Sequence, residues 1–198
     1  MPVAFDSTTL SILLNPDARV PNDPATGKPI DLPKERVQAL VVKIQKEKEK
    51  IVIPAPVTAE ILTVVGPTYA DYLAIINKSR VFEVVPLDEK AAIELAFLNR
   101  DAFAASDKKN RLQPYQKVKV DRQILAICKT AGCDTLYTDD KSLIASAKLC
   151  GIKTVRLSEL PLPDSARQGK LALEPHDELP EMDDDEIDDG GEGDDSKA

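Results

Sequence analysis

The sequence predicts an α/β fold in which a mostly parallel sheet of about five strands is covered by helices on both faces. Three observations predict this fold class. Short apolar runs rich in Val and Ile recur along the first 156 residues, and longer segments with apolar residues at helical spacing separate them. Pro, Gly and polar residues lie where the two kinds of segment meet. A strand that returns to its sheet through a helix runs parallel to its neighbour.

The N-terminal part is expected to contribute two strands and two helices. The first strand is predicted at residues 3–5, and Asp6 with the two hydroxyl residues after it can cap the first helix. Residues 15–32 hold four of the fifteen prolines and are expected to form a loop. Pro33 suits the first turn of the second helix, which ends in a polar run before the strand predicted at 51–53.

The rest of the chain is expected to continue this alternation. Prolines stop the second strand, and Thr58 is expected to cap the next helix. Gly66 and the proline after it separate that helix from another, and Asp88 is expected to cap the helix after the third strand. The remaining strands are expected at 81–85, 135–137 and 153–156, and the remaining helices at 69–78, 89–105, 119–131 and 141–150.

The sequence predicts one α/β domain at residues 1–160 and an acidic tail at 161–198, where the hydrophobic pattern fades. The net charge of the whole chain is −8, but the last 22 residues carry twelve acidic residues and one lysine. The first 176 residues therefore carry 25 basic and 22 acidic residues, a mildly cationic balance that permits a polyanionic partner. The tail has too few apolar residues to offset the entropy of ordering, so we expect it to be disordered.

Several classes of protein are disfavoured by the composition. The three cysteines are an odd number without a CxxC pair, and the one histidine lies near the tail, so neither a zinc site nor a disulfide scaffold is expected. The cysteines are expected to be small core residues. We find no basic start typical of a signal peptide and expect no membrane span, which predicts a cytoplasmic protein.

Acidic residues recur where an expected strand is followed by a helix. Asp6 directly follows the first strand, and Glu60 is expected in the first turn of the helix after the second strand. Asp121 is expected at the start of its helix, and Asp139 and Asp140 follow the fourth strand. Each acid taken alone fits a structural role, because carboxylates at helix N-termini cap backbone amides and complement the helix dipole.

Asp121 is the acid that a capping role explains least well. Ile124, Leu125 and Cys128 lie on its helix face, and we expect this face to pack against the sheet. Asp121 should therefore point over the strand ends, at the edge where ligands bind in parallel sheets. Several carboxylates in one crevice of low dielectric repel one another, and a bound cation relieves the repulsion. Ligands that are all oxygen atoms favour Mg²⁺ or Mn²⁺ over zinc.

Four short motifs occur in an order that resembles a known family. They are FDST at 5–8, TAEIL at 58–62, VDRQILAIC at 120–128 and LYTDDKSL at 136–143. Together they resemble the PIN domain, a family of metal-dependent ribonucleases that includes the VapC-type toxins of toxin–antitoxin pairs. The resemblance covers residues 2 to about 160. It implies a three-layer αβα fold and the hydrolysis of RNA phosphodiester bonds with Mg²⁺ or Mn²⁺ as cofactor.

The resemblance also implies roles for individual residues. The implied catalytic residues are Asp6, Glu60, Asp121 and Asp140, the implied metal ligands are Asp6, Asp121, Asp140 and Asp139, and the implied supporting residues are Thr138 and Ser7. Thr138 would orient a carboxylate or a water molecule. The chain departs from the family pattern at Ser142 and Leu143, where many relatives have Asp and Phe. The loop at 15–32 is also longer than usual.

A cluster of basic residues precedes and overlaps the third motif. The candidates for binding RNA phosphates are Lys108, Lys109, Arg111, Lys117, Lys119 and Arg122, with Tyr115 among them as a candidate for base stacking. The simpler interpretation is an ordinary polar loop. The acidic tail likewise has two interpretations, an aid to solubility or an RNA mimic that lies on this cluster and restrains cleavage.

Other functions remain as alternatives at this stage. A non-catalytic PIN-like module would bind RNA or protein without cleaving RNA. A haloacid-dehalogenase-type phosphatase needs a second acid two residues after Asp6, where this chain has Thr8, and a receiver domain needs paired acids after the first strand. If the toxin interpretation holds, the partners are RNA and a small antitoxin protein. The resemblance also implies a homodimer, and no membrane partner is expected.

Overall fold

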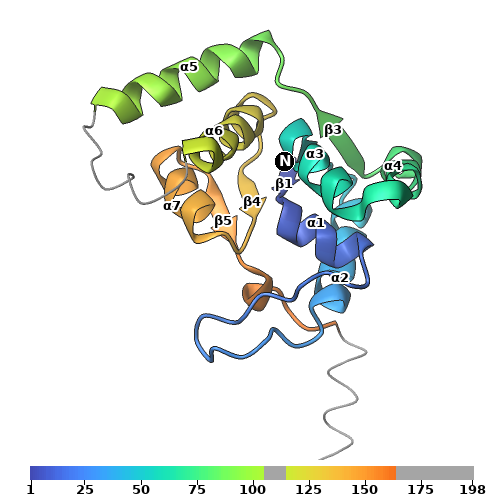
Figure 1. Ribbon diagram of the computed structural model, residues 1–198. Helices are drawn as coiled ribbons and strands as arrows, with labels where there is room; N and C mark the ends of the chain where they lie inside the picture. The colour runs from blue at the N-terminus through green and yellow to red at the C-terminus, as the bar shows by residue number, and fades with distance from the viewer. Residues whose placement is uncertain (105–114, 164–198) are drawn as a thin grey trace, which may run out of the picture. The chain divides into compact units, whose positions relative to one another are not determined.

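The computed structural model describes residues 1–104 and 115–163, and the side chains of residues 1–100 and 117–163. The chain divides into the units Met1–Asp164 and Ser165–Ala198, of which we describe the first (Figure 1). The predicted tail at 161–198, apart from residues 161–163, therefore lies outside the described residues. So do three of the candidate RNA-binding residues, Lys108, Lys109 and Arg111.

Five parallel strands form a single sheet in the order β3-β2-β1-β4-β5, as the alternating pattern predicted. The strands are β1 (Val3–Phe5), β2 (Ile51–Pro54), β3 (Phe82–Val85), β4 (Thr135–Tyr137) and β5 (Lys153–Val155). The chain starts at the centre of the sheet, builds outward through β2 and β3, and returns to add β4 and β5 on the other side of β1. The order therefore reverses between β1 and β4, and such a switch point opens a crevice at the carboxyl ends of the strands.

Seven helices and two short 3-10 turns connect the strands within the described residues. The helices are α1 (Ser7–Leu14), α2 (Pro33–Lys46), α3 (Ala55–Val65), α4 (Tyr69–Lys78), α5 (Glu89–Ala104), α6 (Tyr115–Thr130) and α7 (Lys141–Leu149), and the turns are η1 (Gly66–Thr68) and η3 (Leu157–Glu159). Residues 15–32 form a loop with one isolated bridge between Asn22 and Pro29, as their prolines predicted.

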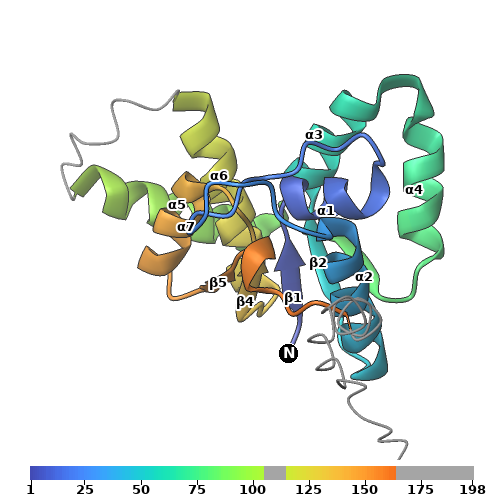
Figure 2. The same cartoon turned by 90° about the horizontal axis from the view of Figure 1, so that it is seen from below.

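Alternate side chains of the strands build two hydrophobic layers, one on each face of the sheet. On one face Val3, Phe5 and Ile51 pack with residues of α2 and η3. On the other face Ala4 and Leu136 pack with residues of α3, α6 and α7, and α5 lies against α6 (Figures 1 and 2). Helices thus cover both faces of the sheet. This is the predicted three-layer αβα architecture.

The core is aliphatic, as the low aromatic content predicted. Its largest fully buried side chains include Leu10, Ile51, Ile53, Leu125 and Leu136. Two of the three cysteines, Cys128 and Cys133, are buried, and the third is partly buried, which agrees with their expected role as small core residues.

Two helices begin earlier than the sequence analysis predicted, which corrects the positions of two candidate acids. α3 begins at Ala55 and not after Thr58, because Pro56 at its second position has no N–H that the first turn must satisfy. Glu60 therefore lies in the second turn of α3, where it is exposed. α6 begins at Tyr115 and not at residue 119, so Asp121 lies in its second turn and not at its start.

The stretch Ala55–Lys78 is long and apolar enough to cross a membrane by the criteria of length and composition alone. It is not one continuous α-helix, because Gly66, with φ of +58°, and the η1 turn separate α3 from α4. Val57 and Ile61 of α3 belong to the core beside the sheet, and α4 contacts β3. The stretch thus folds back on the sheet as two helices.

The burial of a side chain predicts how its truncation affects the stability of the fold. Leu136→Ala, in the fully buried centre of β4, should lower the free energy of unfolding by about 2 to 5 kcal/mol, through lost burial and the cavity left behind. Leu149→Ala is the matched control, because this side chain is 87% exposed, and it should change the value by less than about 0.5 kcal/mol. Urea unfolding measures both, and equal effects would contradict the assignment of the core.

Candidate functional site

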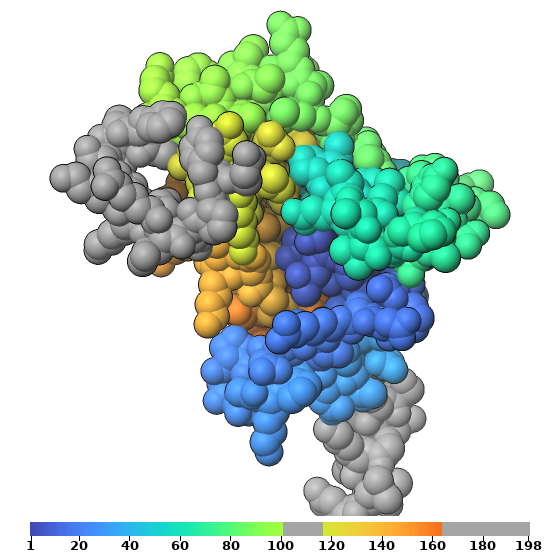
Figure 3. All heavy atoms as spheres, in the orientation of Figure 1, coloured from blue at the N-terminus to red at the C-terminus, as the bar shows by residue number. Residues whose placement is uncertain are grey.

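The candidate acids meet at the switch point between the two central strands. β1 and β4 pair in parallel with Phe5 opposite Tyr137, so the residues that follow each strand lie beside each other. Asp6 follows β1, and the segment from Thr138 to Asp140 follows β4. In Figure 3, α1 and α6 border a hollow on this face of the molecule.

Asp6 is a buried acid as well as a helix cap. Its side chain caps α1 by accepting a hydrogen bond of 2.7 Å from the backbone N–H of Thr9, yet the residue is only 3% exposed. Burial raises the pKa of Asp6 to about 6, against the lowering effect of hydrogen bonds from Thr138 and Thr9. An ordinary cap is solvated and does not carry this electrostatic cost.

Thr138 connects the acid after β1 to the acid after β4. It is fully buried, and its hydroxyl group donates a hydrogen bond to the Asp6 carboxylate. The same hydroxyl oxygen accepts a hydrogen bond of 3.1 Å from the backbone N–H of Asp140. A single side chain therefore orients the Asp6 carboxylate and holds the start of α7 beside it.

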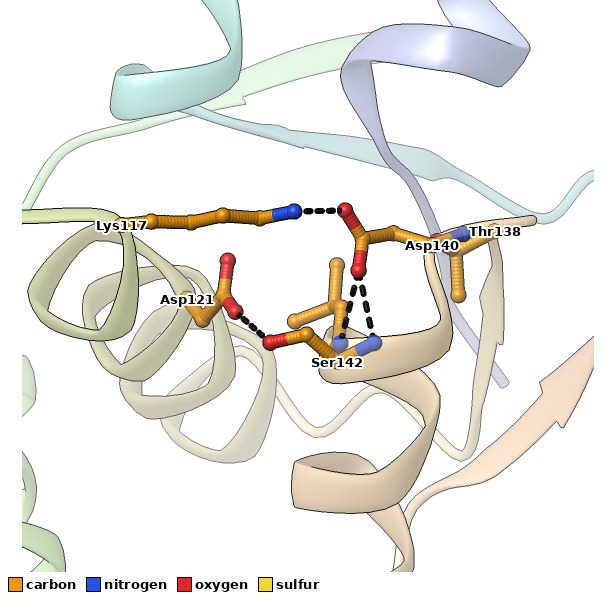
Figure 4. Close-up of polar contacts among 6 residues, drawn as sticks. Lys117, Asp121, Thr138, Asp140 and Ser142 are labelled. Atoms are coloured by element: carbon orange, nitrogen blue, oxygen red, sulfur yellow. Dashed lines mark hydrogen bonds and ion pairs between the residues drawn. The ribbon is translucent and has the colours of Figure 1, made fainter. Parts of the chain in front are cut away.

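Asp140 caps α7 with one carboxylate oxygen and pairs with a lysine through the other. Oδ1 accepts hydrogen bonds from the backbone N–H groups of Ser142 (2.7 Å) and Leu143 (3.2 Å). Oδ2 lies 2.7 Å from the Nζ atom of Lys117 on α6 (Figure 4). Burial alone would raise the pKa of Asp140, but the hydrogen bonds from Lys117, Leu143 and Ser142 bring it below its usual value.

Asp121 is buried on α6, as the apolar residues on its helix face predicted, and its carboxylate contacts the start of α7. Its Oδ2 accepts a hydrogen bond of 2.6 Å from the Ser142 hydroxyl group, and the residue is 6% exposed (Figure 4). Burial is the main cause that raises the pKa of Asp121, and the negative charges of Asp140 and Glu60 raise it further. Ser142 and Lys117 act in the opposite direction without cancelling the rise.

Glu60 and Lys117 complete this group of charges. Glu60 is exposed on α3, and its charge raises the pKa values of both Asp121 and Lys117. The pKa of Lys117 is raised mainly by its hydrogen bond to Asp140, with the charges of Asp140, Asp121 and Glu60 adding to the effect. The ammonium group of Lys117 is therefore attracted to three carboxylates. We call these four residues the acid cluster: Asp121, Asp140, Glu60 and Lys117.

Asp139 and Ser7 lie beside the acid cluster with other partners. The Oδ2 atom of Asp139 accepts a hydrogen bond of 3.2 Å from the backbone N–H of Leu157, which turns this acid toward η3. Its Oδ1 atom is buried without a hydrogen-bond partner in the described part of the chain, and burial raises its pKa. Ser7 opens α1 and lines a cavity of about 730 Å³ together with Glu60 and Arg19.

The described basic residues that were predicted to bind RNA do not form one common surface. The ammonium group of Lys117 pairs with Asp140, although the Lys117 side chain is 47% exposed, and Lys119 is also exposed on α6. The guanidinium group of Arg122 donates a hydrogen bond of 2.9 Å to the side-chain oxygen of Asn99, which directs it toward α5. The structure therefore does not bring Arg122 to the acid cluster.

Sequence reasoning missed the role of Ser142 and the ion pair of Lys117. In the sequence Ser142 stands out only as a departure from the family pattern, yet its hydroxyl group holds Asp121 and its backbone N–H holds Asp140. Its position two residues after a capping acid was the available signal, since the backbone N–H there points at the cap. No local pattern pairs Lys117 with Asp140, because 23 residues separate them.

The carboxylate oxygens at this edge of the sheet are ligands that suit a hard divalent cation. In this structure, however, protein groups form hydrogen bonds to those oxygens. The acids of the cluster and Asp6 offer only oxygen atoms, the ligands that Mg²⁺ and Mn²⁺ prefer. Among the described side chains of residues 1–100 and 117–163, however, no three acidic, histidine or cysteine groups lie close enough together to hold a metal ion. Lys117 and Ser142 hold the oxygen atoms of Asp140 and Asp121 instead.

Comparison with known proteins supports the fold. No protein-family model and no curated protein matches the sequence. A chain from the crystal structure of VapBC2 from Rickettsia felis, bound to a DNA fragment from their promoter, matches at a TM-score of 0.51 and 15% identity, covering 79% of this chain and 98% of that chain. VapC20 of Mycobacterium tuberculosis, a Sarcin-Ricin loop cleaving toxin, matches at 0.44 and 17%, covering 73% and 94%. The first likeness shows that the chain has the PIN-like αβα fold that its motifs implied.

The buried Asp6 predicts a dependence of stability on pH. Its pKa in the folded protein, about 6, exceeds the value of 3.8 for an unperturbed Asp. This group therefore favours folding most below pH 4, and the contribution is lost as pH rises through 6. Asp6→Asn should thus raise the free energy of unfolding at pH 7.5 by about 1 to 3 kcal/mol, measured by urea unfolding with EDTA present, and the gain should vanish at pH 4.

Asp88 offers the matched control for this measurement. It also accepts a hydrogen bond from the backbone at the start of a helix, 2.8 Å from the N–H of Ala91, but it is exposed. Asp88→Asn should therefore bring no gain at pH 7.5. A loss of stability in Asp6→Asn at every pH would show that the Asp6 carboxylate is not under electrostatic strain.

Proposed function

We propose that this chain is a metal-dependent endoribonuclease that hydrolyses RNA phosphodiester bonds. One observation carries the proposal: Asp6, Asp121 and Asp140 lie at the carboxyl edge of the two central strands, and burial raises the pKa values of the first two. Perturbed carboxylates in a crevice are typical of functional sites, because they are costly to maintain for stability alone. The PIN-like fold agrees with this function without establishing it.

The residues of the site suit distinct tasks in such a reaction. Asp6, Asp121 and Asp140 would hold Mg²⁺ or Mn²⁺, whose chemistry is to lower the pKa of an attacking water and to stabilise charge on the phosphate. Thr138 keeps the Asp6 carboxylate oriented, and Ser142 keeps Asp121 oriented. Asp139 is less suited as a ligand, because its Oδ2 atom is engaged by the backbone of Leu157.

The cavity beside the site offers hydroxyl groups and one arginine to a substrate, next to the acids Asp17 and Glu60. Ser7, Thr8 and Ser11 of α1 line it, together with Thr63 of α3 and the exposed Arg19. Hydroxyl side chains can donate to phosphate oxygens and exchange hydrogen bonds with a ribose 2′-OH, and arginine binds phosphate through two donors. Single-stranded RNA is the class of substrate that uses both features.

A non-catalytic PIN-like module is the second candidate, and the ion pair between Lys117 and Asp140 is the observation that favours it. A carboxylate neutralised by lysine has less need of a metal ion, and a protein without the metal would bind RNA or another protein at this face without cleaving RNA. A haloacid-dehalogenase-type phosphatase has less support, because Thr8 lies in α1 where that chemistry needs an acid.

We also propose protein partners for this chain. The VapBC2 structure is a complex bound to promoter DNA, and by analogy a small DNA-binding antitoxin protein would bind this chain as a toxin. The apolar side chains of Val64 and Tyr69 are more than half exposed, and that of Ile75 nearly so. Exposed apolar residues on α3 and α4 suit a contact with a partner protein or with a second copy in a homodimer.

The decisive test is RNA cleavage by the full chain with Mg²⁺ or Mn²⁺. Cleavage should require the metal and stop with EDTA, because the water must be activated at the carboxylates. Asp6→Asn and Asp121→Asn should each lower the cleavage rate by more than about a hundredfold, the order of loss when one charge-stabilising group is removed from an active site. A gel assay with a labelled RNA substrate measures these rates.

Asp88→Asn again serves as the control, since it removes an exposed acid of a helix cap, and it should cleave RNA at the parental rate. RNA binding without cleavage by the parent protein would favour the non-catalytic module. Equal cleavage by the parent and both site variants would place the activity elsewhere.

A further inference from the structure

We propose that Lys117 is an internal cation of the acid cluster and that a divalent metal ion binds by displacing its ammonium group from Asp140. The inference rests on the proposed function, because it concerns how the same carboxylates accept their metal. It also accounts for a contrast in the structure: oxygen ligands suited to a metal are present, yet no three of them among the described residues are arranged around a common point.

The place of Lys117 in the fold follows from helical spacing. Lys117 precedes Asp121 by four residues on α6, so both side chains lie on the same face of the helix. The Lys117 side chain extends past Asp121 to reach Asp140 at the start of α7 (Figure 4). The ammonium group thus bridges the two helices that carry the acids.

The remaining hydrogen bonds leave one oxygen atom of Asp121 and one of Asp140 directed toward the ammonium side. Ser142 holds Oδ2 of Asp121, and backbone N–H groups hold Oδ1 of Asp140. Oδ2 of Asp140 receives the ammonium group, and Figure 4 shows the second oxygen of Asp121 pointing to the same side as the Lys117 chain. Two carboxylates are therefore pre-oriented around the place that the Lys117 charge fills.

The charge balance favours replacement of the lysine by a doubly charged ion. Three acids, Asp121, Asp140 and Glu60, act on one ammonium group, so the cluster keeps an excess of negative charge. The Lys117 side chain is 47% exposed, and that of Asp140 is 30% exposed. An ion pair this accessible to water is weak, and the flexible lysine chain can move into solvent without disturbing α6.

The test is Mn²⁺ binding to the full chain without RNA, comparing the parent with Lys117→Met, which keeps the length of the side chain and removes its charge. We expect about tenfold tighter binding in Lys117→Met, as a competing cation is lost. The control Lys141→Met removes the same charge from an exposed lysine next to Asp140 in sequence, and should change the affinity less than about threefold. Isothermal titration calorimetry gives the affinities.

A second variant separates the site from the acidic residues elsewhere in the chain. Asp121→Asn should abolish the tight binding step in the parent and in Lys117→Met, while any weaker binding by the C-terminal acids persists. Unchanged or weaker Mn²⁺ affinity in Lys117→Met would overturn the inference. An equal gain in Lys141→Met would also overturn it, because the effect would then be one of net charge alone.

Thermal unfolding shows whether the variant is folded and supplies a second readout. Without metal, Lys117→Met should unfold at a lower temperature than the parent, because the acids lose their cation. Saturating Mn²⁺ should restore it to the temperature of the metal-bound parent. If Lys117 only stabilised the packing of α6 on α7, the deficit would persist with Mn²⁺, and the inference would be wrong.

The outcome for Lys117 can be told apart from the outcome for the nuclease. Tighter Mn²⁺ binding by Lys117→Met, combined with no metal-dependent RNA cleavage by the parent, would support the internal cation and contradict the nuclease. Metal-dependent cleavage by the parent, combined with unchanged Mn²⁺ affinity in Lys117→Met, would support the nuclease and contradict the internal cation.

Discussion

The parallel pairing of β1 with β4 is the constraint on which the candidate site depends. Two strands in the same direction end at the same edge, so the acids that follow them are forced together from positions more than 130 residues apart. The hydrophobic layers on both faces keep water away from this edge, and burial then raises the pKa values of Asp6 and Asp121. The same packing that stabilises the fold therefore makes the carboxylates costly, and the surrounding polar groups limit this cost.

Three side chains offset the cost of burying these carboxylates. Thr138 forms a hydrogen bond to Asp6, Ser142 to Asp121, and Lys117 to Asp140. In each pair the two residues lie on different elements of the fold. Thr138 and Ser142 are short, partly or fully enclosed and fixed by the backbone around them, whereas Lys117 is long and exposed. The difference suits their proposed tasks, because orientation of a ligand needs rigidity and release of a site to a metal ion needs a side chain that can leave.

The sequence analysis identified the fold and most of the site but misplaced details that depend on helix boundaries. The five strands and the loop at 15–32 agree with their predicted positions to within a residue or two, since apolar runs and prolines report local structure directly. Glu60 and Asp121 were expected in first turns and lie in second turns, because α3 and α6 begin three to four residues before their predicted starts. Helix ends are set by tertiary packing as much as by local caps, and the prolines at 54 and 56 fit both the end of a strand and the first turn of a helix.

By itself the sequence determined the periodic pattern that requires an αβα fold, the acids that follow the strands, and the burial of Asp121 from the apolar residues on its helix face. These are consequences of short-range chemistry, in which each residue is interpreted with neighbours a few positions away. Only the tertiary structure decided that Lys117 reaches Asp140, that Ser142 holds Asp121, and that Arg122 turns to Asn99 and Asp139 to Leu157. Those pairings join segments 18 to 23 residues apart, and side chains at that separation find each other only after the strands and helices have packed.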